Sequence, residues 1–439
     1  MKFSNLPLSL TDMSAPVIGI ASRTQTPKGL RLHIGLFGRR NAGKSSLINA
    51  LTNQKIAIVS DVPGTTTDPV EKACELAPIG PVVFIDTAGV DDVGVLGGLR
   101  TERSLAVLGW VDVALIVCDA KALTESELEL IRTVKSTATP TVVVLNKADT
   151  ADAKELIATQ EQVRSLGYEP VTVCASQKLN IDAVREAIVK LAQNAVEPDL
   201  PLLGDLVHPG DTVMLVTPID TGAPKGRMIL PQVQAIREVL DADAKCIVVR
   251  ENRLAETLTN EKEPPAFVVT DSQVVQSVVA QTPKTIPVTT FSIQMAYSKC
   301  DLVEMARGAA MIDFLRPGDK VMICETCSHH PQPDDIGRKK LPRWLAKKVG
   351  GELDIEVVVG KDFPVDLTPY KLILQCGGCV VTRRHMLTRL AQAKRQNIPM
   401  TNYGVAISHL QGVLERALEL HPKALKAFHE AREIFANHF

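Results

Sequence analysis

One short segment, GRRNAGKS at residues 38–45, restricts the fold of this chain more than any other. It lies between an apolar run at residues 32–37 and a helical pattern at residues 46–51. Glycines let backbone N–H groups pack closely around phosphates, and the start of a helix adds its dipole. The spacing therefore predicts a nucleotide-binding loop rather than an ordinary glycine-rich turn, with Lys44 at the β- and γ-phosphates and Ser45 on Mg²⁺. The expected contacts come from Gly38, Arg39, Arg40, Asn41, Ala42, Gly43, Lys44, Ser45 and Ser46.

Short apolar runs alternate with amphipathic stretches along the first part of the chain. The runs lie at residues 32–37, 82–86, 113–119, 141–145 and 170–174. Continuous apolar runs of this kind indicate the strands of a parallel sheet that is buried on both faces. The prolines and glycine of EPDLPLLGDLVH, at residues 197–208, are typical of a linker. We therefore predict an α/β protein in which a P-loop domain with a parallel sheet (residues 1–196) precedes two smaller α/β domains (197–291 and 292–439).

The same alternation continues through the two later domains. Strands are expected at residues 212–218, 245–250, 266–270 and 288–291, and then at 320–324, 354–359 and 371–375. A long helix is expected from residue 292 through residue 315. Two further helices, near residues 405–420 and 422–437, are expected to close the chain.

Composition narrows the class of protein. The 439 residues suggest about two to four domains, and 45% apolar content is that of a globular chain. With 49 basic and 50 acidic side chains, no long-range attraction to nucleic acid or to an anionic membrane is expected. We see no signal-peptide pattern and no apolar run long enough to cross a bilayer, and the nine cysteines are an odd number. These features predict a cytoplasmic protein without a disulfide framework.

Three later motifs favour guanine as the base. Asp86, at the end of an apolar run, is placed for the water shell of Mg²⁺, and Gly89 follows it near the γ-phosphate. At the end of another run the Asp149 carboxylate can accept hydrogen bonds from guanine N1–H and its amine, which adenine does not offer. The remaining base contacts are expected from Asn146, Lys147, Ala175 and Ser176.

The ordered set of motifs resembles the TrmE/Era/EngA-like branch of GTPases, over roughly residues 32–194. Asn41 followed by the GTT segment at residues 64–66 is similar to the potassium-dependent members, although Asn41 also suits an ordinary turn. The resemblance implies K⁺ beside the phosphates and Thr66 as the switch threonine on Mg²⁺, with Thr65 and Thr67 as neighbouring alternatives. Because Val90 cannot orient water, we expect slow hydrolysis. The expected catalytic residues are Lys44, Asn41, Thr66 and Asp86.

A second group of residues has metal-ligand chemistry. CETCSHH at residues 324–330 and CGGC at residues 376–379 each follow an expected strand, so both groups should reach the same sheet edge. Two CxxC pairs indicate a tetrahedral zinc site or an iron–sulfur site, and buried inert cysteines are the alternative. The other cysteines are scattered singly, as core residues usually are. They are Cys74, Cys118, Cys174, Cys246 and Cys300.

Taken together, the nucleotide motifs and the cysteine segments make the whole chain resemble the HydF-type GTPases of [FeFe]-hydrogenase maturation. The family pattern, Cys-x-His and later His-Cys-x-x-Cys, is matched by Cys327, His329, Cys376 and Cys379. The resemblance implies a [4Fe–4S] cluster on the three cysteines with an exchangeable fourth ligand. Gln375 stands where the family often has histidine, which leaves the fourth ligand open. The candidates are His329, Asp334, Asp335 and an exogenous molecule, and Cys324 is near enough to compete.

The resemblance also implies a role and partners. The protein is expected to be a scaffold or carrier that assembles a di-iron precursor and delivers it to apo-hydrogenase, with GTP as the switch. Its partners would be the [FeFe]-hydrogenase and two radical-SAM maturases, and the chain would be at least a homodimer. The expected cofactors are GTP, Mg²⁺, K⁺ and the [4Fe–4S] cluster, with Ser45 and Thr66 on Mg²⁺. The competing class is an RNA-modification or ribosome-assembly GTPase with a structural zinc site.

Overall fold

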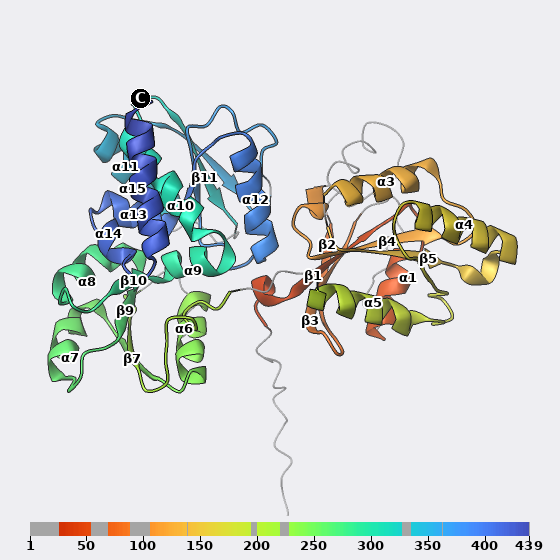
Figure 1. Cartoon of the computed structure of the whole chain (residues 1–439), viewed down its shortest axis with the longest axis horizontal. Helices are drawn as coiled ribbons and strands as arrows, with labels where there is room; N and C mark the ends of the chain where they lie inside the picture. The colour runs from red at the N-terminus through yellow and green to blue at the C-terminus, as the bar shows by residue number, and fades with distance from the viewer. Residues whose placement is uncertain are drawn as a thin grey trace, which may run out of the picture.

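The computed structural model describes residues 26–53, 69–87, 106–137, 139–194, 200–219, 228–326, 335–361 and 363–438. Three sheets organise these residues (Figure 1). We refer to residues 26–194 as the N-terminal unit, to 200–290 as the middle unit and to 291–438 as the C-terminal unit. In Figure 1 the N-terminal unit forms one lobe, and the other two units together form the second lobe.

The N-terminal sheet has six strands in the order β2-β3-β1-β4-β5-β6. Helices α1 and α5 share one apolar core with the sheet, and α3 and α4 share another on the opposite face. Because β1, β3, β4 and β5 run parallel, their carboxyl ends meet at one edge. The strands are β1 (Leu32–Phe37), β2 (Val70–Leu76), β3 (Gly80–Asp86), β4 (Val113–Asp119), β5 (Thr141–Asn146) and β6 (Val171–Thr172). The helices are α1 (Lys44–Thr52), α3 (Glu125–Ser136), α4 (Ala153–Ser165) and α5 (Ile181–Asn194).

The edge strand β2 was not predicted, and it pairs antiparallel with β3 in a sheet whose other strands are parallel. Its sequence, VEKACEL, has no continuous apolar run, and only its last residue is buried. A search for buried parallel strands therefore misses it. In the observed register Val70 pairs with Asp86 and Glu71 pairs with Ile85.

The middle unit is a four-stranded parallel sheet in the order β10-β9-β7-β8. Its strands are β7 (Thr212–Val216), β8 (Lys245–Val249), β9 (Phe267–Thr270) and β10 (Val288–Thr290). Its helices are α6 (Leu230–Asp241), α7 (Leu254–Asn260) and α8 (Val275–Gln281). The strands β7 and β9 are central and almost wholly buried, whereas β8 is only partly covered.

The C-terminal unit contains a second four-stranded parallel sheet, in the order β12-β11-β13-β14. Its strands are β11 (Lys320–Glu325), β12 (Asp354–Val359), β13 (Leu372–Gln375) and β14 (Met400–Asn402). Its helices are α9 (Phe291–Lys299), α10 (Leu302–Ala309), α11 (Leu341–Val349), α12 (Arg383–Arg395), α13 (Tyr403–Leu410), α14 (Leu414–Ala417) and α15 (Pro422–Ala436). The ends of β11 and β13 are adjacent, because Cys324 pairs with Gln375.

Two helix expectations for this unit were wrong. The helix expected at residues 292–315 is broken into α9 and α10, because the Asp301 side chain caps a new helix by accepting from the backbone N–H groups of Val303 and Glu304. The helix expected at residues 405–420 is likewise interrupted at Gly412, whose φ of +73° is unfavourable for other residues. The short strand β14 was also not predicted.

Candidate nucleotide and cysteine sites

The predicted phosphate loop joins β1 to α1, and its backbone approaches its neighbours so closely that two positions require glycine. Gly38 has a φ of +145°, and a Cβ atom there would lie 2.2 Å from the backbone oxygen of Val117. Gly43 has a φ of +96°, and a Cβ atom there would lie 2.1 Å from the side chain of Asn146. The loop is therefore packed directly onto the ends of β4 and β5, at the edge where parallel sheets bind ligands.

Lys44, Ser45 and Asp86 come together at this edge. The Lys44 side chain folds back over the loop, where its Nζ donates to the backbone oxygens of Gly38 at 2.9 Å and Arg39 at 3.0 Å. Ser45 Oγ donates to Asp86 Oδ2 at 3.1 Å. Burial raises the pKa of Asp86, while the nearby charge of Lys44 opposes the change. A hydroxyl and a carboxylate in contact beside a phosphate loop are suited to Mg²⁺ and its water shell.

The residues predicted to contact the base also lie together. Asn146 bridges the two halves of the site: its Nδ2 donates to the backbone oxygen of Ala42 at 2.9 Å, and its Oδ1 accepts from Ala175 N at 3.0 Å. Asp149 Oδ1 accepts from Cys174 Sγ at 3.0 Å. Its other oxygen, Oδ2, accepts from Gln177 Nε2 at 3.2 Å. These contacts hold the carboxylate at the rim of the site.

Asp119 belongs to the same site and was not predicted. It ends β4, and its Oδ2 accepts from Arg39 Nη2 at 3.0 Å and from Lys147 Nζ at 3.3 Å. It therefore fixes one side chain of the phosphate loop and one of the base-binding segment. Its position at the carboxyl end of an apolar strand was the signal that could have identified it.

Several predicted residues lie outside the described part of the chain. In the nucleotide site these are Thr65, Thr66, Gly89 and Val90, and in the cysteine site they are Cys327, His329 and Asp334. Their assigned roles stay predictions. Asn41 is described: it is exposed and has a φ of +61°, a conformation that asparagine tolerates.

Cys376 follows β13 and lies against the end of β11. Its Sγ accepts from Thr326 N at 3.2 Å and is 3.1 Å from Thr326 Oγ1. Thr326 immediately precedes Cys327, so the two predicted cysteine segments approach each other at this contact. Cys379 is partly exposed to solvent, and burial raises the pKa of its thiol to about 11.

Cys324 and Gln375 have different surroundings. Cys324 lies in the apolar core of the C-terminal unit, and burial raises the pKa of its thiol to about 12. Gln375 is fully buried, and its Oε1 accepts from Arg389 Nη1 at 3.0 Å. Asp335 accepts from Arg338 N at 2.9 Å and caps the helical turn that follows it. Among the described residues, no three His, Cys, Asp or Glu side chains are grouped closely enough to hold a metal ion.

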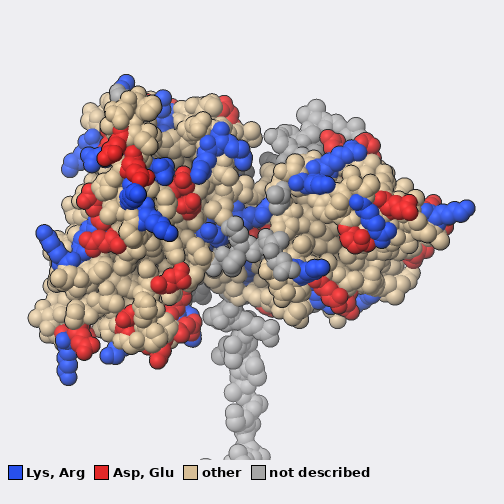
Figure 2. Space-filling view, in the orientation of Figure 1, with Lys and Arg blue, Asp and Glu red and all other residues tan. Residues whose placement is uncertain are grey.

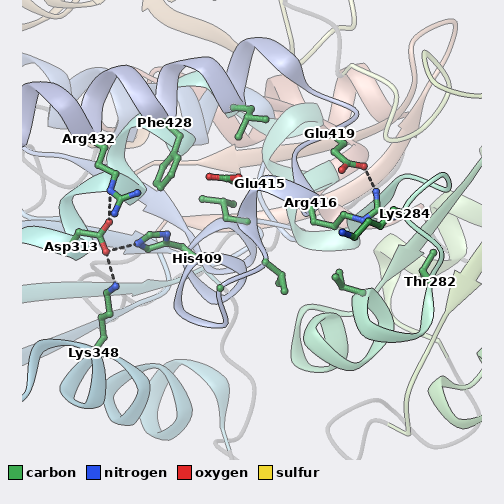
Figure 3. A pocket seen from close by; sticks show the side chains of 15 residues that line it. Thr282, Lys284, Asp313, Lys348, His409, Glu415, Arg416, Glu419, Phe428 and Arg432 are labelled. Atoms are coloured by element: carbon green, nitrogen blue, oxygen red, sulfur yellow. Dashed lines mark hydrogen bonds and ion pairs between the residues drawn. The ribbon is translucent and has the colours of Figure 1, made fainter.

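A pocket lies elsewhere, between the middle unit and the C-terminal unit (Figure 3). Its volume is about 690 Å³. Several polar side chains in it are paired with one another: Asp313 contacts Lys348 at 2.8 Å and His409 at 3.0 Å. This pairing indicates a structural network rather than an open polar site.

The molecular surface shows no single-signed region on the face drawn in Figure 2, where basic and acidic side chains are interspersed. This agrees with the net charge of −1. Within the described residues, none of the helices is both long and apolar enough to span a bilayer.

The curated relatives match little more than a third of this chain. The GTPase Der of Sulfurihydrogenibium sp. (strain YO3AOP1) is 34% identical over 175 residues, which are 37% of this chain and 39% of that protein. The tRNA modification GTPase MnmE of Trichormus variabilis is 38% identical over 167 residues, or 37% of this chain and 34% of that protein. The chain thus spans less than half the length of these relatives. A solved structure of an Aquifex aeolicus Era variant bound to GDP.AlF4- covers 50% of this chain and 93% of its own, at 20% identity and a TM-score of 0.33.

The fold and the arrangement of the nucleotide site define a P-loop GTPase, and a family model described as 50S ribosome-binding GTPase matches residues 33–147. Two further models match later parts of the chain. The hydrogen maturase F dimerization domain matches residues 202–300, and the hydrogen maturase F tetramerization domain matches residues 303–420. The chain therefore belongs to the hydrogen maturase F (HydF) family, which confirms the resemblance seen in the sequence.

Proposed function

We propose that this protein is a cytoplasmic GTP-controlled iron–sulfur carrier of [FeFe]-hydrogenase maturation. It hydrolyses GTP in the N-terminal unit and holds a [4Fe–4S] cluster on Cys327, Cys376 and Cys379. Its cargo is the di-iron precursor, which two radical-SAM maturases supply and which passes to the apo-hydrogenase. The main support is the contact between Thr326 and Cys376, because it joins the two cysteine segments in a unit that matches a hydrogenase maturase domain.

The described cysteines have a donor set that fits a cluster. Backbone and hydroxyl groups of Thr326 surround the Cys376 sulfur, and hydrogen bonds to sulfur stabilise the thiolate form that binds iron. Gly378, with a φ of +67°, allows the tight turn between the two cysteines. When bound, such a cluster supplies an iron that can exchange its fourth ligand. Because burial raises the pKa of Cys379, metal loading must release its proton.

The surroundings favour an exogenous fourth ligand over Gln375 or Asp335. Gln375 is fully buried and bound to Arg389, and Asp335 caps a helical turn through Arg338 N. Moving Gln375 onto iron would leave the buried Arg389 without this hydrogen-bond partner, at a cost of about 1–3 kcal/mol, and moving Asp335 would remove the cap of its helical turn. A small external donor has no such cost, which suits a carrier that must accept and release cargo.

The cysteine assignment is tested by serine variants reconstituted with iron and sulfide under anaerobic conditions. Cys327→Ser, Cys376→Ser and Cys379→Ser should lose most of the bound iron and the EPR signal of the reduced cluster. Cys324→Ser should keep both and still respond to imidazole, and Cys300→Ser, also a buried cysteine of the C-terminal unit, is the matched control.

Two outcomes would contradict this proposal. Loss of the cluster in Cys324→Ser, with no imidazole response in the native protein, would establish a closed four-cysteine site. Zinc in place of iron after anaerobic purification would favour the competing class, an RNA-modification or ribosome-assembly GTPase with a structural zinc site.

We further propose that K⁺ stimulates GTP hydrolysis through Asn41. The side chain is exposed on the phosphate loop, where an ion bound against the phosphates could reach it. Hydrolysis should be faster in K⁺ than in Na⁺ at equal ionic strength, and Asn41→Ala should remove the difference without preventing nucleotide binding. Equal rates in the two salts for the native protein would show that Asn41 only shapes the turn.

A further inference from the structure

A seam of charged and aromatic side chains joins the N-terminal unit to the C-terminal unit. We define it by Glu71, Trp110 and His33 on one side and by Lys361 and His385 on the other. In Figure 1, α12, which contains His385, lies on the side of the C-terminal lobe that faces the N-terminal sheet. The two units therefore meet close to the helix that follows the CGGC segment.

Aromatic rings that are almost wholly buried form the centre of the seam. Trp110 is 8% exposed and stacks on His385, with ring centroids 6.2 Å apart and an interplanar angle of 25°. His33 meets the same indole edge-on at 6.1 Å. Burial lowers the pKa of His33 to about 3 and that of His385 well below its ordinary value. Both rings are therefore neutral at physiological pH and pack as flat apolar surfaces.

An ion pair crosses the seam beside these rings. The Lys361 ammonium contacts the Glu71 carboxylate and lies 3.2 Å from the centroid of the Trp110 ring. Glu71 also pairs with Lys28. Both members of the crossing pair are three-quarters covered, so solvent screens them less than it screens a surface pair. Glu71 lies on β2, next to the residue whose register partner is Asp86 of the nucleotide site.

Hydrogen bonds continue from the segment of Lys361 to Cys376. Gly360, the neighbour of Lys361, accepts from Arg389 Nη2 through its backbone oxygen at 3.0 Å. Arg389 Nη1 donates to Gln375 Oε1 at 3.0 Å, and Gln375 Nε2 lies 3.5 Å from Cys376 Sγ. Arg389 is 3% exposed, and its rigid guanidinium fixes both partners in one geometry. The path from Glu71 to Cys376 is therefore continuous.

The second cysteine has its own contact with the N-terminal unit. A Cβ atom on Gly29 would lie 2.5 Å from the backbone oxygen of Cys379, so the segment before β1 rests directly on the CGGC turn. The buried Lys299 donates to the backbone oxygen of Gly29 at 2.7 Å and holds the segment in place. Both cysteines of the turn are thus linked to the nucleotide-binding unit.

We propose that this seam couples the nucleotide state to the cysteine site, with Glu71 and Lys361 as the positioning residues. A shift of β2 with the nucleotide moves the ion pair, and the Arg389–Gln375 link passes the change to Cys376. The role of the cysteines as cluster ligands rests on the proposed function, but the coupling itself does not. Coupling between two binding sites is reciprocal. Metal binding at the cysteines must therefore change the affinity for the nucleotide by the same factor by which the nucleotide changes the affinity of the cysteines for metal.

The test uses full-length protein without metal, so that it does not depend on cluster assembly. Cys376 and Cys379 are alkylated with iodoacetamide in the presence of GDP or of a non-hydrolysable GTP analogue, and peptide mass spectrometry gives each rate. We expect the Cys376 rate to differ about fivefold or more between the two nucleotides, the lower end of typical coupling. Glu71→Gln and Lys361→Met should reduce the ratio to near one while GTP hydrolysis continues.

Two control variants define what the result means. Lys361→Arg retains a positive charge that can pair with Glu71 and stack on the indole, so it should keep a ratio clearly above one. Lys320→Met removes an exposed ion pair with Glu356 in the same sheet, away from the seam, and should also keep it. An equal Cys376 rate with both nucleotides in the native protein would overturn the proposal. So would a ratio that survives in both Glu71→Gln and Lys361→Met.

The same samples separate this inference from the proposed function. After reconstitution with iron, a native protein that shows the alkylation ratio but binds no cluster refutes the iron–sulfur carrier and supports the coupling. A native protein that binds the cluster but shows no ratio refutes the coupling alone. If Lys361→Met does not fold, the isosteric Glu71→Gln variant still gives the answer.

Discussion

At the scale of single residues, we predict that base selection depends on the Asp149 side chain. Cys174 and Gln177 hold its carboxylate at the rim of the site. The Asp149→Asn variant has no carboxylate to accept hydrogen bonds from guanine N1–H and the amine. Each charged hydrogen bond lost costs about 1.5–3 kcal/mol, so GTP should bind more than about tenfold more weakly. Xanthosine triphosphate, whose C2 carbonyl needs a donor, should bind better than in the native protein.

Competitive binding of the two nucleotides checks this prediction. Asp182→Asn is the control, because Asp182 is an exposed carboxylate at the start of α5, paired with Arg185. An unchanged affinity of Asp149→Asn for GTP would mean that the carboxylate does not contact the base.

The grouping of the residues predicted to bind phosphate and Mg²⁺ could be anticipated from the sequence, although their contacts with a nucleotide stay predictions. Lys44, Ser45 and Asp86 were predicted from motifs, and the structure brings them together because each motif ends or begins an element of one sheet edge. Asp119 was missed because it belongs to no short motif. Its role depends on Arg39 and Lys147, which reach it from two other segments.

At the scale of elements, β8 is the strand that most needs a partner. It ends the strand order of the middle sheet, and Val248 on it is 42% exposed. The neighbouring α6 also exposes Val233 and Leu240. A half-covered edge strand with apolar side chains is a site for pairing with another chain, and this unit matches a dimerization domain. We therefore expect β8 and α6 to lie in the interface between two copies.

Val248→Lys should disrupt that interface, because a charge on an edge strand opposes pairing. Light scattering after size exclusion should show a smaller assembly, with the dissociation constant raised at least about tenfold, since burying an unpaired charge costs several kcal/mol. Ile157→Lys, on the exposed face of α4 in the N-terminal unit, should leave the assembly unchanged. A native-sized assembly in Val248→Lys would place the interface elsewhere.

Element prediction succeeded where burial on both faces makes a strand continuously apolar, as in β4. It failed for β2, which has no continuous apolar run and only one buried residue. It also failed where one side chain ends a helix, as Asp301 does between α9 and α10. Local capping chemistry decides such breaks, and apolar periodicity does not report it.

At the scale of the whole molecule, the seam could not be predicted from the sequence. Glu71 and Lys361 are separated by 290 positions, and neither belongs to a motif. His33, Trp110 and His385 come from three distant segments and meet only because two units are docked. Long-range contacts of this kind depend on how units pack, which composition and periodicity do not specify. The domain limits at residues 196 and 291 stay predictions for the same reason.

Docked units can be energetically coupled and still fold around separate cores. Lys44→Ala tests whether the cysteine site forms independently of the phosphate loop. Lys44 Nζ donates to two backbone oxygens of the phosphate loop, and the cores of the C-terminal unit are formed by residues 293–435. The variant should lose hydrolysis by on the order of 10²-fold or more, because a donor to the developing phosphate charge is gone. Its cysteines should still bind a native amount of iron, since no cysteine contact changes.

Iron content and phosphate release measured on one preparation test this prediction, with Lys154→Ala on α4 as a control for loss of a lysine. An equal loss of iron in Lys44→Ala would show that the cysteine site needs an intact phosphate loop to form, and that the seam transmits folding as well as nucleotide state.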